Sequence, residues 1–282
     1  MDSIDEQLPS ILNNQVSITN LAARSAQGFT LREKRLVMSG LSKFDSRNKR
    51  SLISLKDRTF RVTASEYAEL SQIADEKSAY KDLIASCEKL LDKRLRYKVI
   101  TPRGVKERVL SWVSSVTYHH GEGWVEFSIS EEIMPHVCEL TRQFTQYRLR
   151  QTSELRSVYS WRLLEILTSY NDAQDETKIR VKVLSIADLR SSLEIPDSYK
   201  YDDIKRQVII KGVEELVKKD HWAIQWRPIK TGRAVTSIEF TFNRDPQQDI
   251  FTKPEKTPDR DPNTVDWVDD QFRNPNHPNF GE

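Results

Sequence analysis

The sequence has few cysteines and no long apolar run. Cys87 and Cys138 are the two cysteines in 282 residues, too few for a disulfide scaffold. No Cys/His cluster has the spacing of a zinc site. No stretch approaches the roughly 18 consecutive apolar residues that a membrane-spanning helix needs. The acidic start, residues 1–6, also lacks the basic-then-apolar order of a secretory signal. We therefore expect a protein of the reducing cytoplasm that does not enter a membrane.

The sequence also lacks the motifs that would indicate catalysis. No Gly-x-x-x-x-Gly-Lys-[Ser/Thr] loop occurs, so this chain alone is not expected to use ATP. No serine, histidine and acid set is suggested by position. We expect no catalytic residue, no cofactor and no bound metal.

The charges are divided unevenly along the chain. The whole sequence has a formal charge of +2, but residues 245–282 contain nine acidic and four basic residues, together with six of the eleven prolines. This segment has no periodic apolar pattern, so it cannot bury enough apolar surface to offset its chain entropy. The sequence predicts a basic globular body followed by a disordered, acidic, proline-rich tail.

Apolar periodicity predicts an α+β protein. Thr30 is a candidate N-cap for a helix with Leu36, Val37 and Leu41 inward and Lys34 and Arg35 outward. The remaining expected elements are listed in chain order. They are a strand over 59–62, a helix from Thr63 or Ser65, a helix from Ser78 to Leu91, strands over 95–100, 105–116 and 124–129, helical segments from Glu131 to about Tyr170 with an interruption near Phe144–Tyr147, a strand over 179–184, helices over 186–193 and 201–219, and a hairpin over 223–242.

The order of these elements repeats. Tyr80–Leu83 resembles Tyr201–Ile204, and Val125–Ile129 resembles Ile238–Phe242, at offsets of 121 and 113 residues. The difference falls in the strands around Pro102-Arg103-Gly104, so we expect a longer hairpin in the first copy. Matches in the same order and with the same element pattern indicate a duplicated domain.

Helices followed by a β-hairpin are the outline of a winged helix, in which the last helix enters a major groove and the hairpin lies along the DNA backbone. In the second copy, Arg206 and Gln207 can form bidentate bonds to guanine and adenine, and Asp203 can accept from cytosine. The candidate DNA-binding residues of this copy are Lys200, Asp203, Lys205, Arg206, Gln207 and Lys211 on or before the helix, and Lys230 and Arg233 at the hairpin tip. The alternative is a solvated helix face of mixed charge. Gly212 is expected to indicate close helix packing.

The first copy has a basic face of Lys81, Lys89 and Lys93. Lysines at these positions would contact phosphates and carry little sequence information. A merely soluble surface is the alternative. Trp112, Trp124 and Phe127 of the first hairpin are expected in the core, and a sheet edge here could pair with a second subunit.

Several segments resemble the plasmid replication initiators of the iteron-binding type. They are Ser157–Leu167, Phe144–Tyr147, Leu189–Leu193, Tyr201–Glu215, Gly232–Arg233 and Ile238–Phe240, with Asn14–Val16 and Asn20–Ala22 similar to the family's opening. The resemblance spans residues 14–243. Trp161, Trp222 and Trp226 depart from the family's pattern.

The resemblance implies two winged-helix domains related by pseudo-twofold symmetry. It implies a first domain over 14–130 for dimerisation and DNA backbone contacts, a helical linker over 131–150, a second domain over 151–244 for sequence-specific binding, and the tail over 245–282. It also implies monomers that bind direct repeats of double-stranded DNA at a plasmid origin and help open it. Dimers would bind an inverted repeat and repress the initiator's own gene. The partners implied are the host replication initiator, the replicative helicase and chaperones that convert dimer to monomer, all in the bacterial cytoplasm. From topology and from the resemblance, we expect a monomer–dimer switch to act in the interdomain segment Glu131–Tyr147.

Two other functions fit parts of the pattern. A nicking initiator needs a tyrosine and a metal held by two histidines around one apolar residue, whereas His119 and His120 are adjacent and would point to opposite faces of a strand. Tyr118 is therefore expected to be a hairpin residue. A tandem winged-helix transcriptional repressor without replication activity is the other alternative, because it needs the same base-reading chemistry.

Overall fold

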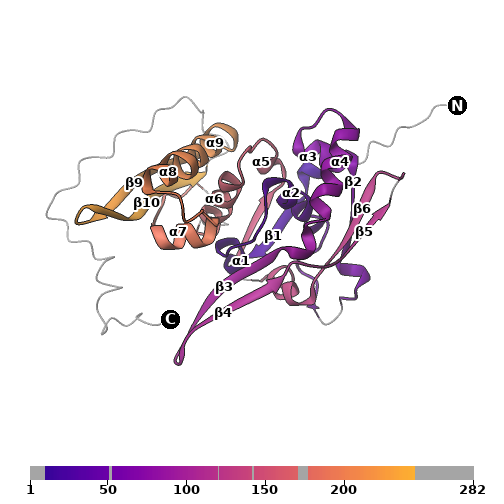
Figure 1. Cartoon of the computed structure of the whole chain (residues 1–282), viewed down its shortest axis with the longest axis horizontal. Coiled ribbons are helices and arrows are strands. Elements are labelled where there is room, and N and C mark those ends of the chain that lie inside the picture. Colours follow the sequence, from indigo (N-terminus) through magenta and orange to yellow (C-terminus); the bar gives the residue numbers. More distant parts are fainter. Residues whose placement is uncertain (1–9, 51–52, 120, 142, 171–176, 245–282) are drawn as a thin grey trace. The chain divides into compact units, whose positions relative to one another are not determined.

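The computed structural model of the chain describes residues 10–50, 53–119, 121–141, 143–170 and 177–244 (Figure 1). The tail predicted over residues 245–282 lies outside them. Within these ranges, none of the helices combines the length and the apolar character needed to cross a lipid bilayer.

Two copies of one element order make up most of the described chain (Figure 1). The first copy consists of α2 (Leu31–Leu41), β2 (Thr59–Thr63), α3 (Ala64–Ser71), α4 (Glu76–Cys87), β5 (Val113–His119) and β6 (Trp124–Ile129). The second consists of α6 (Val158–Thr168), β8 (Arg180–Ser185), α7 (Ile186–Leu193), the helical run α8–η6–α9 (Tyr201–Asp203, Ile204–Ile210, Lys211–Lys219), β9 (Trp222–Thr231) and β10 (Ala234–Arg244). Each copy has a three-stranded antiparallel sheet with its last strand in the middle, β2-β6-β5 and β8-β10-β9. The predicted α+β fold of two winged-helix repeats is confirmed.

The short helices α3 and α7 show the duplication at the level of single residues. Each has eight residues and a hydroxyl N-cap, Thr63 or Ser185, whose oxygen accepts the backbone N–H of an acidic residue three positions on. Each ends at a non-glycine residue in the left-handed region, Gln72 with φ 54° or Glu194 with φ 53°. Left-handed conformation is uncommon for such residues, so its occurrence at both equivalent sites supports a common origin of the two copies.

The segment between the copies differs from the prediction of a helical linker over residues 131–150. It contains a short 3-10 helix, η5 (Glu131–His136), and a strand, β7 (Phe144–Arg148), before α5 (Arg150–Ser153). Strand β7 pairs antiparallel with β1 (Gln15–Thr19) near the start of the chain, between the short helices η1 (Ile11–Asn13) and α1 (Asn20–Arg24). The alternating burial of Thr145 and Tyr147 is the strand period, so the interruption expected near residues 144–147 of the helical linker is a strand.

The strand predicted over residues 105–116 is two strands in two different sheets. Strand β4 (Gly104–Ser111) pairs with β3 (Arg94–Thr101) in a separate hairpin, which we call the arm, and β5 pairs with β6. The chain changes sheet at Trp112, which is fully buried and donates its indole N–H to the carbonyl of Gln27 at 3.0 Å. The extra residues of the first copy lie around Pro102-Arg103-Gly104, as predicted, but they form a separate hairpin, so the prediction of a longer hairpin was wrong.

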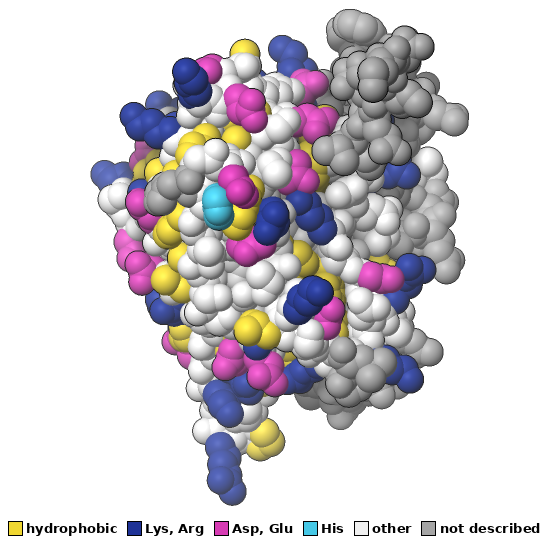
Figure 2. Space-filling view, turned by 90° about the vertical axis from the view of Figure 1, so that its right-hand side faces the viewer, with side chains coloured by type: hydrophobic (Ala, Val, Ile, Leu, Met, Phe, Trp, Pro, Cys, Tyr) yellow, Lys and Arg dark blue, Asp and Glu magenta, His cyan; other side chains and the backbone are white. Residues whose placement is uncertain are grey.

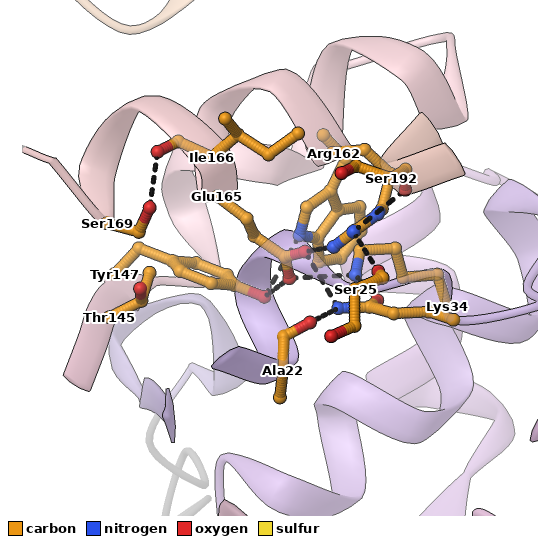
Figure 3. Close-up of polar contacts among 12 residues, drawn as sticks. Ala22, Ser25, Lys34, Thr145, Tyr147, Arg162, Glu165, Ile166, Ser169 and Ser192 are labelled. Carbon is orange, nitrogen blue, oxygen red and sulfur yellow. Dashed lines mark hydrogen bonds and ion pairs between the residues drawn. The ribbon is translucent and has the colours of Figure 1, made fainter. Parts of the chain in front are cut away.

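A buried ionic cluster joins the two copies (Figure 3). Lys34 on α2 was predicted to face outward but is fully buried, with its Nζ 2.7 Å from Oε1 of Glu165 on α6. Arg35, also predicted outward, is 6% exposed. The prediction failed because α2 has one face in its own core and another face against the second copy.

Glu165 is the centre of this cluster. Its carboxylate accepts from Lys34 and Arg162 and, at 2.7 Å, from the hydroxyl of Tyr147, which itself accepts the indole N–H of Trp161 at 3.0 Å (Figure 3). Gln27 also donates to it, at 3.2 Å. Burial alone would raise the pKa of Glu165, but Lys34 and Arg162 lower it below its usual value. Burial lowers the pKa of Lys34 to about 8 against the opposing effect of Glu165.

Other contacts between the copies are reciprocal. Arg35 donates to the carbonyl of Leu155, just before α6, at 2.9 Å, and Arg162, at the same place relative to its N-cap, donates to the carbonyl of Ser25, before α2. Gln72 and Glu194, the left-handed residues that end α3 and α7, also contact the opposite copy. Contacts of residue i with j and of j with i are what a twofold relation produces.

Gln72 after α3 accepts from the guanidinium of Arg156 at 2.8 Å. Glu194 after α7 accepts the backbone N–H groups of Gln27 and Gly28 at 3.1 and 2.6 Å. In both cases the residue that ends the short helix of one copy holds the entry to the first helix of the other copy.

We predict that Glu165→Gln destabilises the fold by about 3–5 kcal/mol, because two buried cations would lose their common counter-charge. Urea denaturation of the purified chain measures this. Glu154→Gln is the matched control, since Glu154 pairs with Lys219 at 2.6 Å on the surface and should cost no more than about 1 kcal/mol. Equal, small losses for both variants would contradict a structural role for the cluster.

A second prediction concerns the base of the arm, where the buried ring of His136 meets Tyr97 edge-on with centroids 5.6 Å apart. Burial, with Arg108 nearby, lowers the pKa of His136 below its ordinary value of 6.5. As the pH falls below about 6.5, the unfolded chain binds a proton that the folded chain resists, so this group reduces stability on acidification. Denaturation at a series of pH values should show a steeper loss for the natural chain than for His136→Gln. Parallel curves would exclude this effect.

Candidate nucleic-acid interface

The helical run from Tyr201 to Lys219 lies on the second copy with one face inward. The buried side comprises Ile204, Val208, Ile209, Gly212, Val213 and Leu216. The predicted span is confirmed, with one difference: residues Ile204–Ile210 are π-helical. A π segment is wider than an α-helix and often occurs at functional sites. It gives this run a broad outer face.

Arg206 lies on the outer face and is held by an acidic neighbour. Its Nη2 is 3.3 Å from Oδ1 of Asp203, and the Arg206 side chain is 67% exposed. The other oxygen of Asp203 accepts the backbone N–H of Lys200 at 3.1 Å, which caps the start of the helix. Asp203 therefore orients Arg206, and the ion pair reduces the repulsion between the Asp203 carboxylate and a phosphate. The spacing of the residues in the sequence did not reveal this orienting role.

Gln207 and Lys211 form a second pair on this face. The Lys211 ammonium donates to Oε1 of Gln207 at 2.5 Å, which leaves the amide N–H groups of Gln207 available as donors. Lys200 and Lys205 are exposed near the start of the run, as a phosphate-contacting role requires. The arrangement places donors for base edges in the middle of the face, with cations beside them.

The β9–β10 hairpin forms the predicted wing. Lys230 and Arg233 are both exposed at its tip, where Gly232 has a φ of 62°. Farther down, Arg227 and Glu239 join the two strands through bonds of 2.6 and 2.8 Å. At the base, Arg244 pairs with buried Asp220 at 2.9 Å. The wing is therefore braced at two levels below its cationic tip.

Close packing fixes the helical run to α6. A Cβ placed on Gly212 would lie 3.1 Å from Cδ2 of Leu163, closer than usual, so the Leu163 side chain would have to shift to accept a larger residue. The packing role expected for Gly212 is confirmed. Because α6 also carries Glu165, the helical run from Tyr201 to Lys219 is joined through this one helix to the buried cluster.

The three lysines proposed for the first copy do not share one face. Helix α4 ends at Cys87, earlier than predicted, so only Lys81 lies on it, while Lys89 and Lys93 flank the 3-10 helix η4 (Leu90–Asp92). Lys81 and Lys89 are exposed. Lys93 instead forms a 2.8 Å ion pair with buried Glu33 and is 17% exposed, which makes it a structural residue.

The groups considered for a nicking enzyme have structural surroundings. Burial raises the pKa of Tyr118 to about 12, which keeps its hydroxyl protonated near neutral pH. His119 stacks on Trp124, with ring centroids 4.7 Å apart. Trp124 was expected in the core but is only half-buried. His120 lies outside the described residues. Trp112 and Phe127 are buried, as predicted. Among the residues that the structure describes, no group of three or more His, Cys, Asp and Glu side chains is arranged to hold a metal.

The sequence reading missed the cations of the arm. Its exposed basic residues are Arg96, Lys98, Arg103, Lys106 and Arg108. They alternate with apolar residues, which is the ordinary pattern of a strand, so the pattern alone does not distinguish them. A count of charge over residues 94–111, six basic against one acidic, would have identified them.

Comparison with known proteins places the chain in a family. Residues 15–168 match the family model described as Initiator Replication protein, WH1, and residues 185–242 match the one described as Initiator Rep protein, WH2. The chain belongs to the family of initiator replication proteins. The predicted resemblance is confirmed.

Solved structures show similar folds. The chain is similar to the Pi initiator protein in its complex with iteron DNA, with a TM-score of 0.67 and 20% identity over 83% of this chain and 99% of that one. It is also similar to the WH1 domain of MSBI1.176, a replication protein isolated from a multiple sclerosis patient, with 22% identity over 38% of this chain and 77% of that one and a TM-score of 0.29. Domains 2 and 3 of RctB match over 80% of this chain and 82% of that one with 8% identity and a TM-score of 0.43.

We predict that Arg206→Ala weakens binding to the specific site by about 1–3 kcal/mol and relaxes the preference at one base position. Lys89→Ala should weaken binding to all sequences alike and reduce the salt slope by about one unit. Fluorescence anisotropy on a set of single-base site variants measures both effects. Identical behaviour of the two variants across the set would contradict separate roles.

Proposed function

We propose that this protein initiates plasmid replication by binding directly repeated double-stranded DNA sites at the origin. Membership of the initiator family supports the replication role. The similarly folded Pi initiator protein was crystallised with iteron DNA, which supports the same class of ligand here. The observation that carries the proposal is the exposed face around Arg206, a base-reading side chain oriented by Asp203 on a helix next to a cationic wing.

We assign the base contacts to residues 151–244 and the backbone contacts to residues 14–130. Helix α6 goes with the second domain in this division because it packs on α9 through Gly212. The base-edge group comprises Asp203, Arg206, Gln207 and Lys211, and the phosphate group comprises Lys200, Lys205, Lys230, Arg233, Lys81 and Lys89. Residues 131–150, with η5 and β7, connect the two domains.

The remaining functions follow the family resemblance. A monomer would open the origin and recruit the host replication initiator and the replicative helicase in the bacterial cytoplasm. A dimer would repress the initiator's own gene. Strand β5 is the edge of its three-stranded sheet, and we assign the dimer contact to it because an edge strand has unpaired backbone groups. Chaperones would convert the dimer to the monomer.

A plasmid-maintenance assay tests the replication role. A plasmid whose only origin is this gene with its flanking DNA should be maintained in a host without another initiator. The same plasmid with Arg206→Ala should be lost, because specific binding is reduced by about 1–3 kcal/mol. Lys218→Ala is the control, since Lys218 is exposed near the end of the same run, and it should be maintained.

The protein would be a repressor instead if the natural gene failed to maintain the plasmid while specific binding to the flanking DNA stayed intact.

A separate experiment tests the nicking alternative. Incubation of the protein with supercoiled origin DNA and a divalent metal should give no covalent protein–DNA adduct. An adduct at Tyr118 would overturn the proposal of a non-catalytic initiator.

A further inference from the structure

The β3–β4 arm is an element that the winged-helix repeat does not require. In the second copy the chain passes from α9 directly into the β9–β10 hairpin, whereas the first copy inserts the arm before β5. The arm is a two-stranded sheet of its own, and no other named strand of the described chain pairs with its edges beyond the single bridge between Arg96 and Ala26 at its root. It stands clear of the body at the lower edge of Figures 1 and 2.

The arm carries a high positive charge. Residues 94–111 contain six basic residues and one acidic residue. Glu107 faces Lys98 across the ladder. Within the part of the chain that the structure describes, none of Arg96, Lys98, Arg103, Lys106 and Arg108 has a carboxylate at ion-pair distance. By the strand register, Arg96 and Lys98 lie on one face of the arm and Lys106 and Arg108 on the other. Unneutralised cations on both faces attract a polyanion.

Apolar side chains are exposed at the end of the arm. Ile100 and Val105 face each other across the last rungs and are 88% and 66% exposed. The turn beyond them contains Pro102 and Arg103, both exposed, and Gly104 with a φ of 117°. In proteins that bend DNA through the minor groove, isoleucine and proline are among the residues that insert between base steps.

The root of the arm is fixed. Arg96 and Ala26 exchange two backbone hydrogen bonds, of 2.9 and 3.2 Å, and Leu95 is fully buried. Tyr97 packs on His136, and Trp112 ends the second strand in the core. The arm is therefore held in place before any ligand binds, which reduces the ordering entropy that binding would cost.

We propose that the β3–β4 arm is a further DNA-binding element, which enters the minor groove of duplex DNA beside the site read by the second copy. Its lysines and arginines contact the phosphates, and Ile100 with Pro102 presses against a base step. The inference rests on the proposed function for the position of the DNA. The charge favours DNA over a second copy of the chain, because pairing two arms would bring two sets of uncompensated cations together.

The charge part of the proposal is tested by Lys98→Ala/Lys106→Ala in the full chain. If each lysine neutralises one phosphate, the slope of log K against log salt becomes shallower by about 1.8. The loss should be the same on specific and on random duplexes. The matched control is Lys49→Ala/Lys56→Ala, two exposed lysines between α2 and β2, which should leave the slope unchanged.

The tip is tested by Ile100→Ser, which removes no core contact because the side chain is exposed. Permanganate reactivity of thymines beside the bound site should fall to the level of free DNA, while base preference within the site is kept. Val109→Ser is the control, since Val109 is 49% exposed nearer the root of the same arm and should keep the reactivity.

Unchanged salt slope and unchanged reactivity in the arm variants would overturn the proposal. So would a shift from dimer to monomer for Ile100→Ser in sedimentation with DNA binding unaffected, which would make the arm a contact between protein chains. If the natural chain bound no specific site, the proposed function would fail, yet the slope on random duplex would still decide whether the arm binds DNA.

Discussion

The carboxylate of Glu165 is the group on which the arrangement of the two repeats depends. It is fully buried on α6 and accepts from Lys34, Arg162, Gln27 and Tyr147, which come from four different parts of the chain. An isolated charge in such a place would be strongly unfavourable, and the attraction of the two cations offsets that cost only while the geometry is kept. Because the loss of one member leaves the others unpaired, the cluster favours a single relative placement of α2 and α6.

The reciprocal contacts extend this constraint to the ends of both repeats. Arg35 and Arg162 each hold the segment that leads into the other repeat, and Gln72 and Glu194 do the same from the ends of the short helices. Helix α6 packs at Gly212 on the helical run of Tyr201–Lys219, so a single helix lies between the cluster and the element that carries Arg206. Under the proposed function both repeats contact DNA, so a rigid connection between them would determine which site spacings fit.

Local signals in the sequence predicted the second repeat well. Helix α7 spans the expected residues 186–193, and the span from Tyr201 to Lys219 follows from apolar period alone. The predictions that failed concern residues whose structural partners lie far away along the chain. Lys34 seemed a surface residue because Glu165, its counter-ion, lies 131 residues away. Strand β7 seemed part of a helical linker because its partner is β1. In the candidate site, periodicity identified the exposure of Arg206, but the pairing with Asp203 depends on the helix start, which periodicity does not resolve.

The distribution of charge separates specificity from affinity. The reading helix, residues 201–219, has five basic and four acidic residues, so it is close to neutral. Such a helix can select bases by directed hydrogen bonds but contributes little of the counterion release that holds a protein on DNA. The arm has the opposite composition, with six basic residues and one acidic residue. Acidic residues on the reading helix would weaken binding if that helix were the main source of affinity. They are compatible with tight binding when the cations lie on a separate element, and Asp203 then serves to orient Arg206 without reducing the attraction of the whole protein for DNA.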